Sequence, residues 1–240
     1  MADKVYIGVG HGGADPGAVK YGLKEKDLAL AIAQACYDEL RRHGVPAMMS
    51  RTKDETEVLA KKIAECNKYA PTVALDIHIN AGGGDGAEVF HTYLGGKGKT
   101  LAKNILAEIK NIGQNSRGTK IKKNSSGKDY FGFIRSTNAP AVIVECAFVD
   151  NKTDIAIIDT KAEQVAMGVA IAKGVLSTLK IKWVEPVKEE PAAKVEDKLY
   201  RVFNKDGKQV GAYSVEVNAF DKAKVLLKSG GKATITLGKK

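Results

Sequence analysis

The chain has 240 residues, of which 44% are hydrophobic and 28% charged, and its formal net charge is +10. This length allows one core of about 100–150 residues with an accessory module, and the composition excludes a disordered or fibrous chain. The sequence has no run of about 20 apolar residues and no helix-turn-helix or zinc-finger pattern, so we expect no membrane span and no nucleic-acid partner.

Strand and helix patterns alternate over the first 182 residues. Apolar residues at helical spacing predict helices over residues 25–43, 55–69, 97–112 and 160–180. Short apolar runs predict strands over residues 4–10, 45–51, 72–80, 87–93 and 141–149. This order predicts an α/β fold with a mostly parallel central sheet and helices on both faces, and a site at the carboxyl ends of its strands.

A change of composition separates this domain from the rest of the chain. Residues 183–197 contain two of the six prolines and several glutamates without apolar periodicity, which predicts an extended linker. We therefore expect a large domain over residues 1–182 and a small module over residues 198–240.

The small module is predicted to be of the α+β class and is strongly basic. Its pattern predicts a hairpin around Asp206-Gly207, a helix over residues 218–228 and a last strand over residues 233–237. Residues 197–240 contain ten Lys and Arg against four Asp and Glu, which is more than half of the excess positive charge.

The first residues and the cysteines indicate the compartment. Residues 1–13 contain an early aspartate and a short apolar stretch broken by glycines, so we expect no signal peptide and synthesis in the cytoplasm. Cys36, Cys66 and Cys146 lie far apart in apolar segments, so we expect buried, reduced thiols.

Four acidic or imidazole residues lie where predicted elements meet loops. His11 follows the first strand, Glu25 opens the first long helix, His78 lies near the end of the strand 72–80, and Glu145 lies within an apolar strand. Two histidines and a carboxylate can hold zinc with one position open to water, and a further carboxylate can act as a general base. Single histidines and helix-first glutamates also serve structural roles, so spacing alone leaves both interpretations open. Glu145 favours a functional site, because a carboxylate in an apolar strand is costly to bury unless it is paired or bound to a metal.

Three ordered stretches carry a resemblance to a known family. They are GHGGADPGAVKYGLKEKDLAL at residues 10–30, DIHINA at residues 76–81 and PAVIVECAFVDN at residues 140–151. In their order, spacing and flanking residues, over residues 1–180, the chain resembles the zinc-dependent N-acetylmuramoyl-L-alanine amidases of type 3, which occur in phage endolysins and bacterial autolysins. The resemblance implies a peptidoglycan hydrolase that cuts the amide between N-acetylmuramic acid and L-alanine, with Zn²⁺ as cofactor and the bacterial cell wall as partner.

The resemblance also implies roles for single residues. The family's zinc-binding His, Glu and His match His11, Glu25 and His78, and its catalytic Glu matches Glu145, which would take a proton from the attacking water and return it to the leaving nitrogen. Asp76 stands where the family usually has serine, and we expect this difference to change the hydrogen bonds around His78.

Two further residues are candidates for substrate binding. Asn80 follows His78 by two positions and is expected either to orient that histidine or to contact substrate. Arg135 precedes the strand of Glu145 and can bind a stem-peptide carboxylate through its forked donors, the alternative being a solvated loop arginine.

The expected biological role depends on the module and on the route to the wall. The hairpin–helix–strand order of residues 198–240 weakly resembles half of a sporulation-related peptidoglycan-binding repeat, so we expect a cell-wall-binding module, with a purely solubilising basic domain as the alternative. Its small core makes dimerisation through the module a further expectation. A phage endolysin would reach the wall through a holin-type pore and an autolysin through cell lysis. A zinc peptidase acting on the stem peptide and a wall-binding protein with an inactive site remain as alternatives.

Overall fold

The computed structural model describes residues 3–186, 198–213, 222–225, 227 and 232–239. The chain divides into two compact units, Met1–Val184 and Glu185–Lys240. The predicted linker over residues 183–197 lies largely outside the described residues. Of the predicted helix over residues 218–228, the structure describes residues 222–225 and 227, and these are helical.

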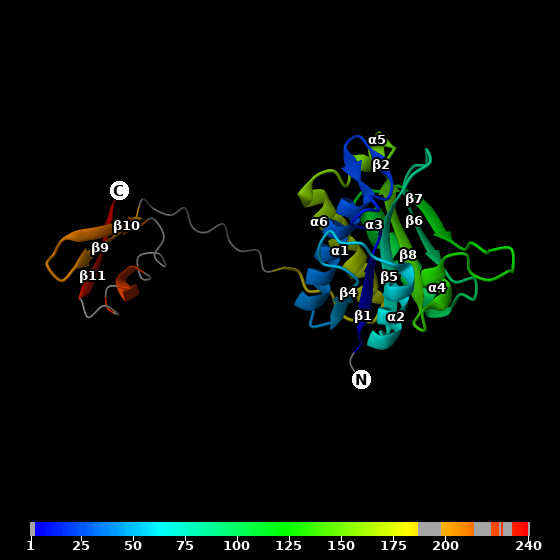
Figure 1. The fold of residues 1–240 in the computed structure, drawn as a ribbon, viewed down its shortest axis with the longest axis horizontal. Helices are drawn as coiled ribbons and strands as arrows, with labels where there is room; N and C mark the ends of the chain where they lie inside the picture. Colours follow the sequence, from blue (N-terminus) through cyan, green and yellow to red (C-terminus); the bar gives the residue numbers. More distant parts are fainter. Residues whose placement is uncertain (1–2, 187–197, 214–221, 226, 228–231, 240) are drawn as a thin grey trace. The chain divides into compact units, whose positions relative to one another are not determined.

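A six-stranded sheet forms the centre of the first unit, in the order β4-β1-β5-β8-β6-β7 (Figure 1). Its strands are β4 (Ala47–Met49), β1 (Val5–Val9), β5 (Val73–Asn80), β8 (Ala141–Phe148), β6 (Ala87–His91) and β7 (Ser116–Lys120). The first four are parallel, whereas β6 is antiparallel to β8 and parallel to β7. The predicted α/β class is confirmed, and the starts of β6 and β7 lie at the same edge as the carboxyl ends of β5 and β8.

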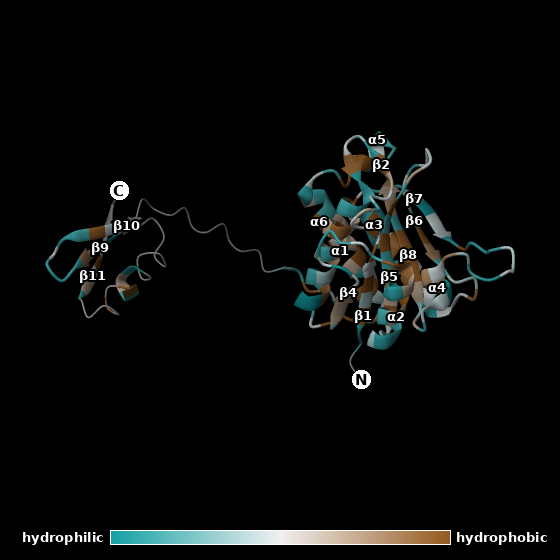
Figure 2. Ribbon diagram, in the orientation of Figure 1, coloured by the Kyte–Doolittle hydropathy of each residue, from teal (hydrophilic) through white to brown (hydrophobic). Residues whose placement is uncertain are grey.

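Helices cover both faces of this sheet (Figure 1). The larger core lies between one face and three helices, α1 (Glu25–Arg42), α3 (Gly96–Asn111) and α6 (Lys161–Thr178). The smaller core lies on the other face with α2 (Leu59–Tyr69) and α4 (Gly132–Ser136). Alternate residues of β1 point to opposite faces, so Ile7 joins the larger core and Tyr6 the smaller one. Figure 2 shows hydrophobic residues concentrated in the central strands. Among the described residues, no helix has the length and apolarity to cross a membrane.

Several short elements lie outside the predicted ones. They are β7, α4, α5 (Lys152–Ile155) and a two-stranded hairpin made of β2 (Val19–Lys20) and β3 (Leu23–Lys24). Each is too short to show periodicity. The helix predicted over residues 55–69 begins only at Leu59, because Val58 has an extended backbone and Glu57, before it, accepts a hydrogen bond from the Ser50 hydroxyl and pairs with Lys62.

The second unit contains a three-stranded antiparallel sheet in the order β10-β9-β11. These strands are β9 (Lys198–Asn204), β10 (Gln209–Tyr213) and β11 (Ala233–Lys239). The β9–β10 connection includes Gly207 at φ 75°, in the left-handed region that glycine favours. The predicted hairpin and last strand are therefore present, while dimerisation through this unit stays a prediction.

Candidate metal centre

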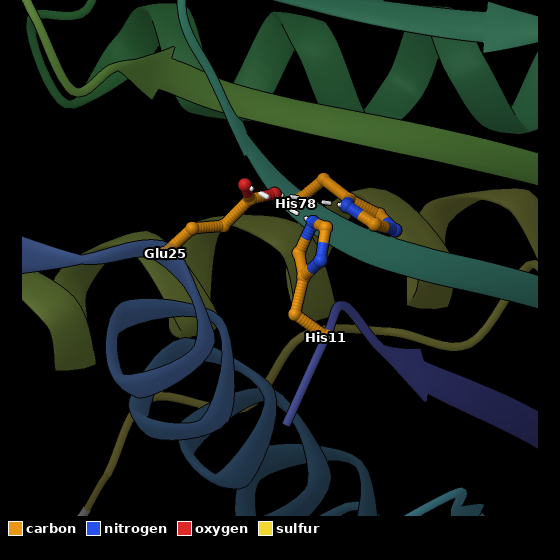
Figure 3. A group of neighbouring side chains, drawn as sticks. All are labelled: His11, Glu25 and His78. Carbon is orange, nitrogen blue, oxygen red and sulfur yellow. Dashed lines mark hydrogen bonds and ion pairs between the residues drawn. The ribbon is translucent and has the colours of Figure 1, made fainter. Parts of the chain in front are cut away.

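Three side chains from separate elements converge at the carboxyl edge of the sheet (Figure 3). His11 follows β1, Glu25 is the first residue of α1, and His78 belongs to β5. One ligand atom of each lies within 4.8 Å of the others. Nε2 of His11 is 3.1 Å from Oε2 of Glu25, and Nδ1 of His78 is 2.9 Å from Oε1 of Glu25. Two imidazoles and one carboxylate form a donor set that suits zinc.

The local backbone makes this approach possible. His11 has φ 57°, an uncommon conformation for a residue other than glycine and one that concentrates at functional sites. The loop that follows is closed by reciprocal backbone hydrogen bonds between Gly12 and Asp15, at 2.9 and 3.1 Å. A Cβ atom on Gly10 would lie 2.7 Å from the ring of His78, so glycine leaves the space that this ring occupies.

Each histidine has a second carboxylate at its other nitrogen. Nδ1 of His11 is 2.8 Å from Oδ2 of Asp15, and Nε2 of His78 is 3.5 Å from Oδ2 of Asp76. Carboxylates in this position fix the tautomer and the orientation of a metal-binding imidazole. Both rings therefore direct the remaining nitrogen at Glu25.

The charges of these groups shift one another's pKa. Burial disfavours the charged form of His78, but Asp76, with Glu25 and Glu145, outweighs burial and raises the pKa of His78 to about 10. The hydrogen bond to Glu25 raises the pKa of His11. Burial also disfavours an ionised Glu25, yet the two histidines lower its pKa to about 2. A metal ion that binds here has to displace protons from the imidazoles.

Glu145 lies beside this cluster on the adjacent strand. It pairs in register with His78 across β5 and β8. Its carboxylate makes no hydrogen bond or ion pair with the part of the chain that the structure describes. Burial raises the pKa of Glu145 to about 7, and the negative charges of Glu25 and Glu88 act in the same direction. A carboxylate with such a pKa can accept and return a proton at neutral pH.

The two predicted substrate residues have other partners. The Asn80 amide donates to Oε1 of Glu88 at 3.0 Å, and its oxygen accepts a hydrogen bond from the backbone N–H of Ala81 at 2.8 Å. Orientation of His78 by Asn80 stays a prediction. Nη1 of Arg135 donates to the backbone carbonyls of Asp129 and Tyr130 at 2.7 and 2.8 Å, and so Arg135 holds the chain that leads into α4. Contact of either residue with substrate stays a prediction.

A buried charge network beneath His78 is not visible in the sequence. Nζ of Lys62 lies 2.9 Å from Oδ1 of Asp76 and 3.1 Å from Oε2 of Glu57. It also donates to the carbonyl of Val9 at 3.0 Å. The only available signal is Asp76 itself, a carboxylate in an apolar strand.

A pocket of about 260 Å³ opens beside the two histidines. Its wall combines polar groups, including Asp15 and Glu57, with the apolar side chains of Phe131, Phe133 and Ile143. The cluster is therefore reachable by a ligand from the side of α2 and α4.

Comparison with known proteins gives consistent matches. The family model described as N-acetylmuramoyl-L-alanine amidase matches residues 5–177. The chain is 36% identical to N-acetylmuramoyl-L-alanine amidase CwlM of Bacillus licheniformis, over 63% of this chain and 58% of CwlM. It is 32% identical to the endolysin of Bacillus phage SPP1, over 76% of this chain and 68% of the endolysin. The structure of Cwp6 from Clostridium difficile superimposes with a TM-score of 0.73 at 36% identity, covering 75% of this chain and 30% of Cwp6.

Proposed function

This chain belongs to the N-acetylmuramoyl-L-alanine amidase family, and we propose that it hydrolyses the amide between N-acetylmuramic acid and L-alanine in peptidoglycan, with zinc as cofactor. One observation carries the proposal. His11, Glu25 and His78 present ligand atoms within 4.8 Å of one another, next to the carboxylate of Glu145 on the neighbouring strand.

The three clustered residues would hold the ion. His11 and His78 would bind it through the nitrogens that face Glu25, since the opposite nitrogens lie against Asp15 and Asp76. Bound there, zinc supplies Lewis acidity toward water and the amide carbonyl.

Glu145 moves the proton. Its carboxylate accepts a proton from the water as the water oxygen bonds to the lactyl carbonyl carbon. The resulting carboxylic acid of Glu145 gives this proton to the alanine nitrogen as the C–N bond breaks, which leaves a lactyl carboxylic acid and a free amine and regenerates the Glu145 carboxylate. The lactyl acid then loses its remaining proton to the released amine or to solvent. The raised pKa, about 7, makes uptake and release comparably easy at neutral pH.

The remaining roles follow from the module and from the relatives. Residues 1–182 would form the catalytic domain, and the basic residues 198–240 would bind the wall, which raises the local concentration of the enzyme on its polymer. A relative that is itself an endolysin supports action on the wall. The enzyme would reach the wall through a holin-type pore, as a phage endolysin, or through lysis of the producing cell, as an autolysin.

Mass spectrometry of digested muropeptides tests the proposal. We expect free lactyl groups and peptides with a new N-terminal alanine, full loss of activity with a chelator, and recovery with zinc. A new amine inside the stem peptide would instead identify a peptidase. Metal-loaded protein that releases neither product would contradict hydrolysis altogether.

A further inference from the structure

Four side chains form a row across four neighbouring strands at the site. In the order β5-β8-β6-β7, His78 pairs in register with Glu145, and Glu145 with Glu88. Arg117 of β7 ends the row, with Nε 2.9 Å from Oε2 of Glu88. Neighbouring strands are about 4.8 Å apart, so Arg117 begins about 10 Å from the strand of Glu145.

Glu88 is held in place within this row by hydrogen bonds to both of its carboxylate oxygens. Its side chain is 9% exposed, and its two oxygens accept hydrogen bonds from Asn80 at 3.0 Å and from Arg117. Asn80 comes from the same strand as His78. Glu88 therefore ties the position of Arg117 to the strand that carries the candidate metal ligand.

Only one edge of the Arg117 guanidinium is used. Nη1 and Nη2 make no hydrogen bond with the residues that the structure describes, and the side chain is 39% exposed. The guanidinium carbon lies 5.1 Å from the centre of the Phe148 ring, which supports the group from beneath. A guanidinium held at Nε, with both terminal NH2 groups free, is arranged to bind a carboxylate in a bidentate manner.

We propose that Arg117 binds a carboxylate at the second or third residue of the stem peptide. The inference rests on the proposed function, which puts the scissile amide between His78 and Glu145. An extended peptide advances about 3.5 Å per residue, so the separation of about 10 Å matches two to three residues. We assign peptide recognition to Arg117 because, among the described residues, both of its terminal NH2 groups are without hydrogen bonds, whereas Nη1 of Arg135 is bound to two backbone carbonyls.

Kinetics on matched substrates test this assignment. The full chain loaded with zinc is given muramoyl tripeptides with free carboxylates, and the same peptides with a carboxamide at the second or at the third residue. On the free acid, Arg117→Gln should raise KM by about 10- to 100-fold with little change in kcat, the loss that one hydrogen-bonded charge supports. On the peptide amidated at the contacted residue, wild type and variant should have equal KM. On the free acid, the KM of Arg117→Lys, which keeps a positive charge beside Glu88, should lie between the KM of the wild type and that of Arg117→Gln.

Arg135→Gln is the matched control, and its effect should be the same on acid and amide peptides. An equal loss for Arg117→Gln on acid and amide peptides, or no loss on either, overturns the proposal, because the arginine then serves only Glu88.

Calorimetry of both peptides with the Glu145→Gln variant gives a second readout without turnover. There the acid should bind at least about tenfold more tightly, and Arg117→Gln should abolish the preference. If the acid peptide binds more tightly but the wild type cleaves neither peptide, the role of Arg117 is supported and the proposed function is refuted. If the wild type cleaves the peptides but binds acid and amide equally, only the role of Arg117 is refuted.

Discussion

Asp76 joins the candidate metal ligand His78 to a buried charge. Oδ2 of Asp76 lies 3.5 Å from Nε2 of His78, and Oδ1 lies 2.9 Å from the ammonium of Lys62. Burial opposes ionisation of Asp76, but Lys62 and His78 hold its pKa below the usual range. Because Asp76 stays ionised, it can accept a hydrogen bond from one nitrogen of His78 and leave the other directed at Glu25.

Replacing Asp76 with serine should weaken both the fold and the metal site. The variant leaves Lys62 buried with only Glu57 as a charged partner, so we expect the free energy of unfolding to fall by about 3–5 kcal/mol. Zinc affinity should fall by about 10- to 100-fold, since His78 loses the group that orients it. Chemical denaturation and competition with a chelating dye measure the two effects. Adding Lys62→Met together with Glu57→Gln, which removes the other buried charge of this network, should restore stability but not zinc affinity. Recovery of both would show that Asp76 acts only through Lys62.

Removing the acid–base function of Glu145 should separate metal binding from turnover. Glu145→Gln keeps the size of the side chain but cannot exchange the proton, so kcat should fall by about 10²- to 10⁴-fold while zinc content stays at the wild-type level. Glu108→Gln, a change of the same kind on α3, is the control and should leave both unchanged. Undiminished turnover in the Glu145 variant would assign the proton transfer to another group.

Stabilisation by zinc should grow with pH. The folded-state pKa of His78 is raised from 6.5 to about 10, so its stabilising charge is fully present below about 6.5 and is lost as pH rises through about 10. Zinc-bound imidazoles carry no competing proton, and the gain in Tm on adding zinc should therefore rise across this interval. Calorimetry at a series of pH values measures it. His78→Gln should flatten the profile, and a pH-independent gain in the wild type would show that zinc binds elsewhere.

The second unit should contribute to binding of the cell wall and not to the rate of amide hydrolysis. A chain ending at Val184 keeps the whole family match, so its rate on soluble muropeptides should equal that of the full chain. Its binding to purified walls should fall by about 10²-fold or more, because the tethered module no longer contributes. Cosedimentation measures binding, and equal sedimentation of the two chains would leave the module without a targeting role.

Local patterns were sufficient for the main elements and for the positions of the clustered residues, whereas the metal-binding role of those residues was implied only by the family resemblance. The core strands and long helices show their apolar periodicity within single segments, and His11, Glu25 and His78 stand at the ends of those segments. Parallel strands bring such ends to one edge, so the convergence follows from the fold class.

Contacts between residues far apart in the chain could not be predicted from these local patterns. Lys61 and Lys62 are adjacent and identical in type, yet the first side chain is 72% exposed and the second 6%, because only Lys62 faces Asp76. Arg117 lies in the polar segment SRGTK, which becomes a strand only through pairing with β6. Its relation to Glu88 depends on a reversal of direction at β6 that apolar spacing does not encode.

Gly17 offers a test of how tightly the site is packed. It has φ 65°, and a Cβ atom would lie 2.6 Å from both Oε2 of Glu25 and Cδ2 of His11. Gly17→Ala should therefore push two candidate ligands apart, and we expect zinc affinity to fall by at least about tenfold, as for loss of a supporting contact. The left-handed backbone adds a destabilisation of about 1–2 kcal/mol for any L-residue.

Gly22 separates these two effects. It has φ 80° in the nearby hairpin, but a Cβ atom there would meet nothing within 4 Å. Gly22→Ala should show a similar loss of stability, because the backbone strain is alike, and should bind zinc as the wild type does. Equal zinc affinities in the two alanine variants would mean that His11 and Glu25 can relax around the added methyl group, and that the site tolerates more movement than its contacts suggest.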